Sequence, residues 1–250
     1  MLDFLVKDGV AWLTFERGEV LNAINRELAN AFRLRIEELQ KRADVRAVVT
    51  RGAGRAFCAG SDLHELSPLS ASEAAAYELE FAEIFAKLDD LPQPTIAMVH
   101  GYALGGGLGL ALYHDFRIAA TSASLGMPEV ELGWIPPWAV GRLAETVGIA
   151  QARWLLMSCN LLTGARAADI GLVNEAVPED QLLSRVEEFA TRLASMPAEG
   201  LSSTKAFLNR ISPLRNIEYD RLASENFRDC FAKPAAQERV RSFLARKAKR

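Results

Sequence analysis

The stretch "PTIAMVHGYALGGGLGLALYHDFRIAAT" (residues 94–121) decides the fold. Its residues 95–99 are mostly apolar, which is typical of a buried strand, and they lead toward the glycines 105–107. Residues 108–112 then predict a helix, and residues 116–120 predict another strand. A strand, a glycine-rich loop, a helix and a second strand in this order indicate an α/β fold.

The flanking sequence extends this pattern in both directions. Residues 9–16 and 45–50 predict strands, whereas residues 25–41 and 72–88 have the spacing of helices. From residue 139 onward the chain is mainly helical, with short breaks. We therefore expect an α/β fold with a sheet rich in parallel strands and a helical C-terminal part.

Three consecutive glycines between a strand and a helix need a physical reason, because glycine destabilises a helix. Glycines 105–107 permit positive φ angles or a close approach to the backbone, and the first N–H groups of the following helix are free. A second glycine-rich loop, residues 52–62, also follows a predicted strand. Two such loops can donate two backbone hydrogen bonds to one oxygen that becomes anionic during a reaction. Alternatively, the glycines only allow tight turns and close packing of helix and sheet.

Two phosphate-binding motifs are excluded. No Gly-Lys-Ser or Gly-Lys-Thr follows either loop, which excludes a P-loop. Leu110 stands where the dinucleotide-binding fingerprint has its third glycine, so that motif fails as well.

Composition argues against several other classes of protein. The net charge of −3 argues against a nucleic-acid binder. The three cysteines lack CxxC spacing, which fits a reducing cytoplasm and gives no support to a metal site. No stretch approaches the roughly 18 apolar residues of a membrane-spanning helix. We therefore expect a cytoplasmic protein with no metal, no membrane association and no nucleic-acid partner.

Five blocks of the sequence together point to a known family. They are "VLNAIN" (20–25), "GAGRAFCAGSDL" (52–63), "PQPTIAMVHGYALGGGLGLALYHDFRIAAT" (92–121), "LGMPEVELGWIPP" (125–137) and "TGARAADIGLVNEAVP" (163–178). In order and spacing they resemble the crotonase (enoyl-CoA hydratase/isomerase) superfamily over most of the chain. The second and third blocks resemble the loops that carry two oxyanion donors, and the fourth resembles the segment that supplies a catalytic carboxylate.

The resemblance implies a fold and a substrate class. It implies a crotonase-like spiral of ββα units over residues 1–197, which carries the CoA-binding and catalytic site. It implies a helical segment over residues 198–250, used for oligomerisation and active-site cover in a homotrimer or a dimer of trimers. The implied substrate is an acyl-CoA thioester, so coenzyme A is part of the substrate and no separate cofactor is expected.

By position, the resemblance assigns the two oxyanion donors to the backbone N–H groups of Ser61 and Gly106, and the catalytic acid or base to Glu129. The best-known hydratases have a second glutamate, which falls here on Gly109. One carboxylate suffices to move a double bond, because the same group can take a proton from one carbon and return it to another. We therefore prefer enoyl-CoA isomerase activity, with hydratase activity next. A glutamate introduced at position 109 is expected to raise hydratase activity if nothing else is lacking.

The segment after Glu129 leaves further alternatives open. If this segment is extended, Glu131 points to the same side as Glu129 and is a possible second carboxylate. The run "WIPP" (134–137) resembles the hydratase/lyases that act on an aromatic, feruloyl-like enoyl-CoA. Trp134 and Trp138 either line an acyl pocket or are ordinary core aromatics.

A function of another class is a non-catalytic acyl-CoA or RNA-binding module, because a fold alone does not fix a function. Glu129 and the two glycine-rich loops favour the enzyme, and the sequence has no aromatic and basic stripe that favours RNA. The basic run at residues 241–250 is expected to be a solvated helix end, with its cations near the negative pole of the helix dipole. Alternatively, it helps to hold the phosphates of a nucleotide-containing ligand.

Overall fold

Six strands form the central sheet in the computed structural model, which describes residues 1–213 and 215–247. β1 pairs with β2 in the antiparallel direction, and every other neighbouring pair in this sheet is parallel. In their order across the sheet the strands are β1 (Leu2–Lys7), β2 (Val10–Phe15), β3 (Ala47–Gly52), β4 (Thr95–Val99), β6 (Phe116–Ala120) and β9 (Glu175–Val177). The inner strands are almost wholly buried, as their apolar runs predicted.

A second sheet of three short strands contains β5 (Tyr102–Leu104), β7 (Ser124–Gly126) and β8 (Leu162–Thr163). β4 of the first sheet is followed by β5 of the second sheet and then by α4 (Gly106–Tyr113). The next pair, β6 and β7, lies parallel to β4 and β5 respectively. This repetition confirms the predicted α/β fold built from ββα units.

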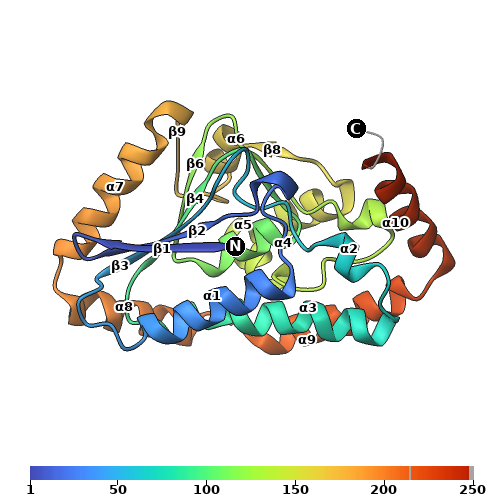
Figure 1. Cartoon of the computed structure of the whole chain (residues 1–250), viewed down its shortest axis with the longest axis horizontal. Coiled ribbons are helices and arrows are strands. Elements are labelled where there is room, and N and C mark those ends of the chain that lie inside the picture. Colours follow the sequence, from blue (N-terminus) through green and yellow to red (C-terminus); the bar gives the residue numbers. More distant parts are fainter. Residues whose placement is uncertain (214, 248–250) are drawn as a thin grey trace.

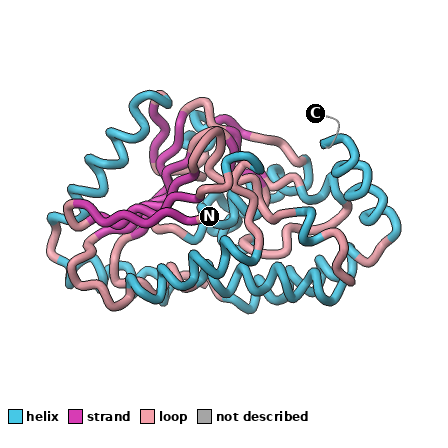
Figure 2. Tube along the Cα trace, viewed as in Figure 1, coloured by secondary structure: helices cyan, strands magenta, loops and turns pink. Residues whose placement is uncertain are grey.

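The helices enclose the strands from several sides (Figure 2). α7 contacts five strands of the central sheet, whereas α1 packs on α3 and α3 packs on α9. Figure 1 shows α1, α3 and α9 together along one side of the molecule, with α7 and α10 toward opposite ends. The helices are α1 (Arg26–Leu39), α2 (Leu63–Leu66), α3 (Ala71–Ala86), α4, α5 (Val140–Ser158), α6 (Gly164–Asp169), α7 (Glu179–Ser195), α8 (Ala198–Ile211), α9 (Ile217–Phe231) and α10 (Pro234–Lys247), with 3-10 helices η1 (Gly18–Val20) and η2 (Glu129–Leu132).

Two buried ionisable side chains attach the C-terminal helices to the rest of the fold. Lys205 of α8 lies 2.9 Å from the carboxylate of Asp115 and donates to the carbonyls of Leu88 and Gln93. Asp220 of α9 accepts a hydrogen bond from the backbone N–H of Ala139. Because a buried charge is costly without partners, these contacts fix α8 and α9 firmly against the core.

The expected elements agree closely with the observed ones where the sequence pattern is long. The strand at residues 95–99 has the predicted bounds, and the helix predicted at residues 72–88 is α3. The short strands of the second sheet were not predicted, because two or three residues carry no periodic signal. Of the basic run at residues 241–250, the last three residues lie outside the described residues, and the preceding ones end α10.

Candidate active site

The two glycine-rich loops lie directly against each other. The backbone N–H of Cys58 donates to the carbonyl of Tyr102 at 3.0 Å, and the N–H of Leu104 donates back to the carbonyl of Cys58 at 3.0 Å. A Cβ atom on Gly60 would lie 2.8 Å from the carbonyl oxygen of Leu104 and 3.2 Å from the amide nitrogen of Gly106. The loops can approach this closely only because a glycine stands at the contact.

This contact places the two predicted oxyanion donors beside one cavity. Ser61 follows Gly60 directly, and Gly106 is the first residue of α4, where an N–H group has no intrahelical acceptor. Within the described chain, neither the Ser61 amide nor the Gly106 amide donates a hydrogen bond. Both residues line the same cavity, so their N–H groups are available for an oxygen that enters it. Their role in catalysis stays a prediction.

The cavity has a volume of about 550 Å³, and its surface is mainly apolar. Its apolar lining comes from distant parts of the chain: Val20, Leu21, Ala23, Ala59, Leu63, Leu66, Leu104, Pro128, Leu132, Trp134, Pro137, Phe243 and Leu244. Such a lining suits an acyl chain, with a few polar groups to orient it.

Glu129 is the predicted acid or base, and its side chain reaches the glycine loop. A Cβ atom on Gly105 would lie 2.7 Å from Oε1 of Glu129, so the glycine leaves the space that this carboxylate occupies. Glu129 is 8 % exposed and lines the cavity, and none of the described residues bonds to its Oε2. Burial raises the pKa of Glu129 to about 8, and the nearby Glu78 adds to the shift.

Glu78 of α3 is a second buried carboxylate in the cavity, and it was not predicted. It is 2 % exposed, and its Oε2 accepts hydrogen bonds from Oγ of Ser61 at 2.9 Å and from Nε1 of Trp138 at 2.8 Å. The sequence held a signal for it, because Glu78 lies four residues after Ala74 and three before Phe81, both of which are buried. A glutamate in the apolar stripe of a helix is rarely buried without a special reason.

Glu131 does not share a side with Glu129, contrary to what an extended segment would give. Residues 129–132 form the 3-10 helix η2, in which side chains two apart point in different directions. Glu131 is exposed and lies at the mouth of the cavity. The condition of an extended segment is not met, because the chain turns after Pro128 and buries Glu129, and a role for Glu131 as a second carboxylate stays a prediction.

The two predicted pocket tryptophans have different positions. Trp134 lines the cavity and packs edge-on against Phe227 of α9, with ring centroids 5.6 Å apart. Trp138 is not among the residues that line the cavity, and it packs between Phe85 and Tyr113 in the core. Trp134 thus fits the acyl-pocket prediction in position, whereas Trp138 is a core aromatic whose indole N–H bonds to a cavity carboxylate.

Trp138 also occupies the space beside Gly109. A Cβ atom on Gly109 would lie 2.5 Å from the six-membered ring of Trp138. A glutamate at position 109 therefore requires the indole to move, and the expected gain in hydratase activity from this single substitution stays a prediction. The Trp138 ring packs against the backbone of Gly109, so the residue at one position limits the size of the residue at the other.

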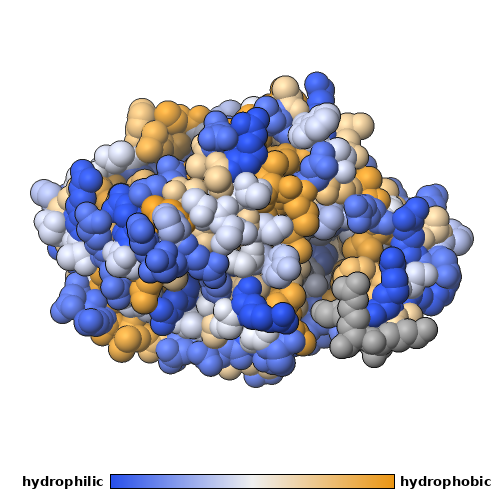
Figure 3. All heavy atoms as spheres, turned by 90° about the horizontal axis from the view of Figure 1, so that it is seen from above, coloured by the Kyte–Doolittle hydropathy of each residue, from blue (hydrophilic) through white to orange (hydrophobic). Residues whose placement is uncertain are grey.

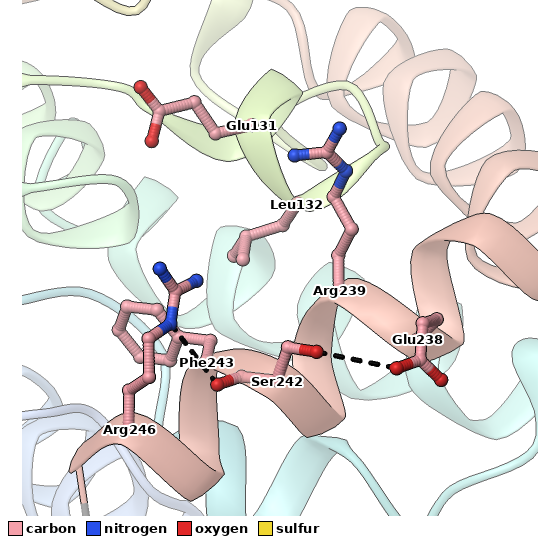
Figure 4. A pocket seen from close by; sticks show the side chains of 7 residues that line it. All are labelled: Glu131, Leu132, Glu238, Arg239, Ser242, Phe243 and Arg246. Carbon is pink, nitrogen blue, oxygen red and sulfur yellow. Dashed lines mark hydrogen bonds between the residues drawn. The ribbon is translucent and has the colours of Figure 1, made fainter.

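Arginines of α10 lie beside the mouth of the cavity. Figure 4 shows Arg239 and Arg246 extending from α10 into a hollow that also contains Glu131 and Leu132. The backbone carbonyl of Ser242 accepts a hydrogen bond from Nε of Arg246 at 3.3 Å. The rest of both guanidinium groups remains available to an anionic ligand.

Hydrophilic residues cover much of the face in Figure 3, with apolar residues gathered between them. Among the described residues there is no cluster of three or more His, Cys, Asp or Glu side chains arranged to hold a metal ion. None of the helices in the described part is both long and apolar enough to span a membrane.

Comparison with known proteins identifies the family. The family model described as enoyl-CoA hydratase/isomerase matches residues 6–249. The chain is 31% identical over 246 residues to a short-chain-enoyl-CoA hydratase of Clostridium acetobutylicum, covering 97% of this chain and 94% of that one. It is 32% identical over 248 residues to a crotonyl-CoA hydratase of Syntrophomonas wolfei, covering 96% and 94% of the two chains.

A solved structure agrees with this result. An enoyl-CoA hydratase of Mycobacterium smegmatis superposes with a TM-score of 0.88 at 27% identity, covering 99% of this chain and 89% of the other. The match extends over both sheets and the C-terminal helices, because almost the whole chain is aligned. The chain belongs to the enoyl-CoA hydratase/isomerase family.

Proposed function

We propose that this protein acts on an enoyl-CoA thioester through an enolate. The N–H groups of Ser61 and Gly106 hold the thioester oxygen, and Glu129 transfers a proton at the carbon next to the carbonyl. The observation that carries this proposal is that both free N–H groups and the buried Glu129 line a single apolar cavity. Fixed donors aimed at a developing oxyanion typically contribute a factor of about 10²–10³ in rate each.

The protonation state of Glu129 supports a role as an acid. With a pKa of about 8, its carboxyl group keeps its proton near neutral pH. It can then give this proton to the α carbon while a nucleophile adds to the β carbon. The apolar lining lowers the local dielectric constant, which strengthens the hydrogen bonds made inside the cavity.

Hydration of a 2-enoyl-CoA is the reaction that we favour. The preference for isomerisation was based on a single carboxylate, and Glu78 now supplies a second one in the same cavity. The names of the relatives from Clostridium acetobutylicum and Syntrophomonas wolfei, both hydratases, support the same choice. Isomerisation remains the next candidate, because it needs the same proton transfer at the α carbon.

The CoA portion has a suitable place beside the cavity. Arg246 lines both the cavity and the adjoining hollow, Arg239 lines the hollow, and both side chains can pair with phosphate oxygens. We propose that they hold the phosphates of CoA while the acyl chain enters between Leu132 and Trp134.

A panel of CoA thioesters tests the reaction. Short, long and aromatic 2-enoyl thioesters and 3-enoyl thioesters are assayed for loss or gain of the conjugated absorbance. We expect loss of absorbance with a straight-chain 2-enoyl-CoA, since hydration removes the double bond. Gain of absorbance with 3-enoyl-CoA alone would establish an isomerase, and turnover of the aromatic thioester alone would establish the hydratase/lyase. Tight CoA binding without turnover of any thioester would establish the non-catalytic module.

Replacement of Glu129 tests its role directly. Glu129→Gln should lower turnover by about 10²–10⁴ while CoA binding persists, because the amide has nearly the same shape but cannot transfer the proton. Turnover is measured with the best thioester of the panel, and CoA affinity is measured by calorimetry. Glu131→Gln is the comparison, because Glu131 lies two residues away and is exposed. If Glu131→Gln loses turnover and Glu129→Gln keeps it, the roles of the two residues must be exchanged.

The raised pKa of Glu129 also predicts how stability depends on pH. The group titrates near pH 4.5 in the unfolded chain and near pH 8 in the folded protein, so the unfolded state alone ionises between these values. Stability from this group is therefore complete below pH 4.5 and is lost as the pH rises to about 8. Glu129→Gln should gain stability relative to the parent from pH 5 to pH 9, on the order of 1–3 kcal/mol. Urea unfolding at several pH values measures this, and a pH-independent difference would contradict the raised pKa.

An oligomer is proposed as the working form. Several large apolar side chains of α5 and α8 are exposed in the single chain, and an interface between copies would cover them. They are Ile149, Trp154, Met157, Phe207, Leu208 and Ile211. Light scattering at micromolar concentration should give three or six times the mass of one chain. A monomeric mass would remove this proposal.

A further inference from the structure

Glu78 carries the further inference, and its contacts show how it is held. Two donors bond to the same oxygen, Oε2: the hydroxyl of Ser61 at 2.9 Å and the indole of Trp138 at 2.8 Å. Oε1 accepts no hydrogen bond from the described residues, although the side chain lines the cavity. The carboxylate is thus fixed by one oxygen, and the other oxygen is free for a molecule in the cavity.

Trp138 contacts both the Glu78 carboxylate and position 109, where the best-known hydratases have a glutamate and this chain has a glycine. Its six-membered ring occupies the space that a side chain at position 109 would need. Its indole nitrogen points to Glu78, which comes from a different helix, α3, and lies 60 positions away in the sequence. The carboxylate absent from α4 is therefore replaced in the cavity by one that reaches it from α3.

Glu78 and Glu129 share the cavity and influence each other. Burial raises the pKa of Glu78 to about 7, while the hydrogen bonds from Trp138 and Ser61 favour its ionised form. Proximity to Glu78 raises the pKa of Glu129 further. Near neutral pH the favoured arrangement has Glu129 protonated and Glu78 partly ionised, since two adjacent buried carboxylates resist ionising together.

A structural role alone does not require an ionisable group at position 78. A glutamine could place its carbonyl oxygen where Oε2 lies and accept there from both the Trp138 indole and the Ser61 hydroxyl. It would do so without the cost of burying a carboxylate. A glutamate at this position therefore indicates that its ability to accept a proton is used in a reaction.

We infer that Glu78 is the catalytic base that takes a proton from the attacking water during hydration, an inference that rests on the proposed function. The water oxygen bonds to the β carbon, and the electrons of the double bond move toward the α carbon and the thioester oxygen. One water proton passes to Glu78, and Glu129 gives its own proton to the α carbon. The product gains a hydroxyl group from the water and a proton from Glu129, which together make up one water. Glu78 then loses its new proton to solvent and Glu129 takes one up, so that both carboxyl groups return to their starting states.

Glu78→Gln separates this role from a structural one. We expect hydration of 2-enoyl-CoA to fall by about 10²–10⁴, because no group then accepts the water proton. Exchange of the α protons of a saturated acyl-CoA with deuterium oxide should stay close to the parent rate, because it needs only Glu129 and the two N–H donors. Glu83→Gln is the matched control, since Glu83 lies on the same helix and is exposed. Circular dichroism and CoA affinity verify that each variant is folded.

The outcomes are distinct. Loss of hydration with retained exchange in Glu78→Gln supports the inference. Unchanged hydration, or an equal fall of both rates, overturns it, as does a parent enzyme that isomerises 3-enoyl-CoA without hydrating 2-enoyl-CoA. If the parent protein neither turns over any thioester nor exchanges α protons, the proposed function itself fails.

Trp138→Phe gives a second, independent test. It keeps an aromatic ring over Gly109 but removes the indole donor that stabilises the ionised form of Glu78. The rising limb of the pH profile of kcat/KM for hydration should then move to higher pH, because that limb reports the ionisation of the base. An unmoved limb in a folded variant would overturn the assignment.

Discussion

The contact between the two glycine-rich loops is the constraint on which the candidate active site depends. A Cβ atom on Gly107 would lie 2.0 Å from the carbonyl oxygen of Cys58, and one on Gly60 would lie 2.8 Å from that of Leu104. Side chains at these positions would force the two segments apart. With glycines, the backbone hydrogen bonds between the segments form, and two residues from distant parts of the chain whose N–H groups donate to none of the described residues line the same cavity.

The carboxylates are arranged around this fixed backbone. Glu129 approaches from the turn after β7, and the absence of a side chain at Gly105 leaves room for its Oε1. Glu78 approaches from α3 through the hydroxyl of Ser61, whose own amide faces the cavity. Desolvation keeps both groups less acidic than in water, so that protons can be exchanged near neutral pH. The backbone of the two loops and hydrogen bonding thus fix the positions of the two carboxyl groups, and burial raises their pKa values.

The longer strands and helices and part of the candidate site could be predicted from the sequence. β4 and the glycine loops carry strong local signals, and Glu129 was reached through the resemblance of its segment to a known family. Glu78 was missed, because a helical pattern shows which residues share a face but not what that face meets in the folded chain. Trp138 posed the same difficulty, since its partner lies 60 positions away. Contacts of this kind depend on the relative placement of elements, which no short stretch of sequence contains.

The packing of Trp138 against Gly109 has a consequence for how this lineage can evolve. A change at Gly109 alone meets the indole ring, whereas a smaller residue at position 138 alone leaves a void and deprives Glu78 of a donor. A glutamate on α4 therefore requires changes at both positions, since either change alone brings a clash or a void. Such coupling makes the order of the two substitutions matter, because neither change is free of cost without the other.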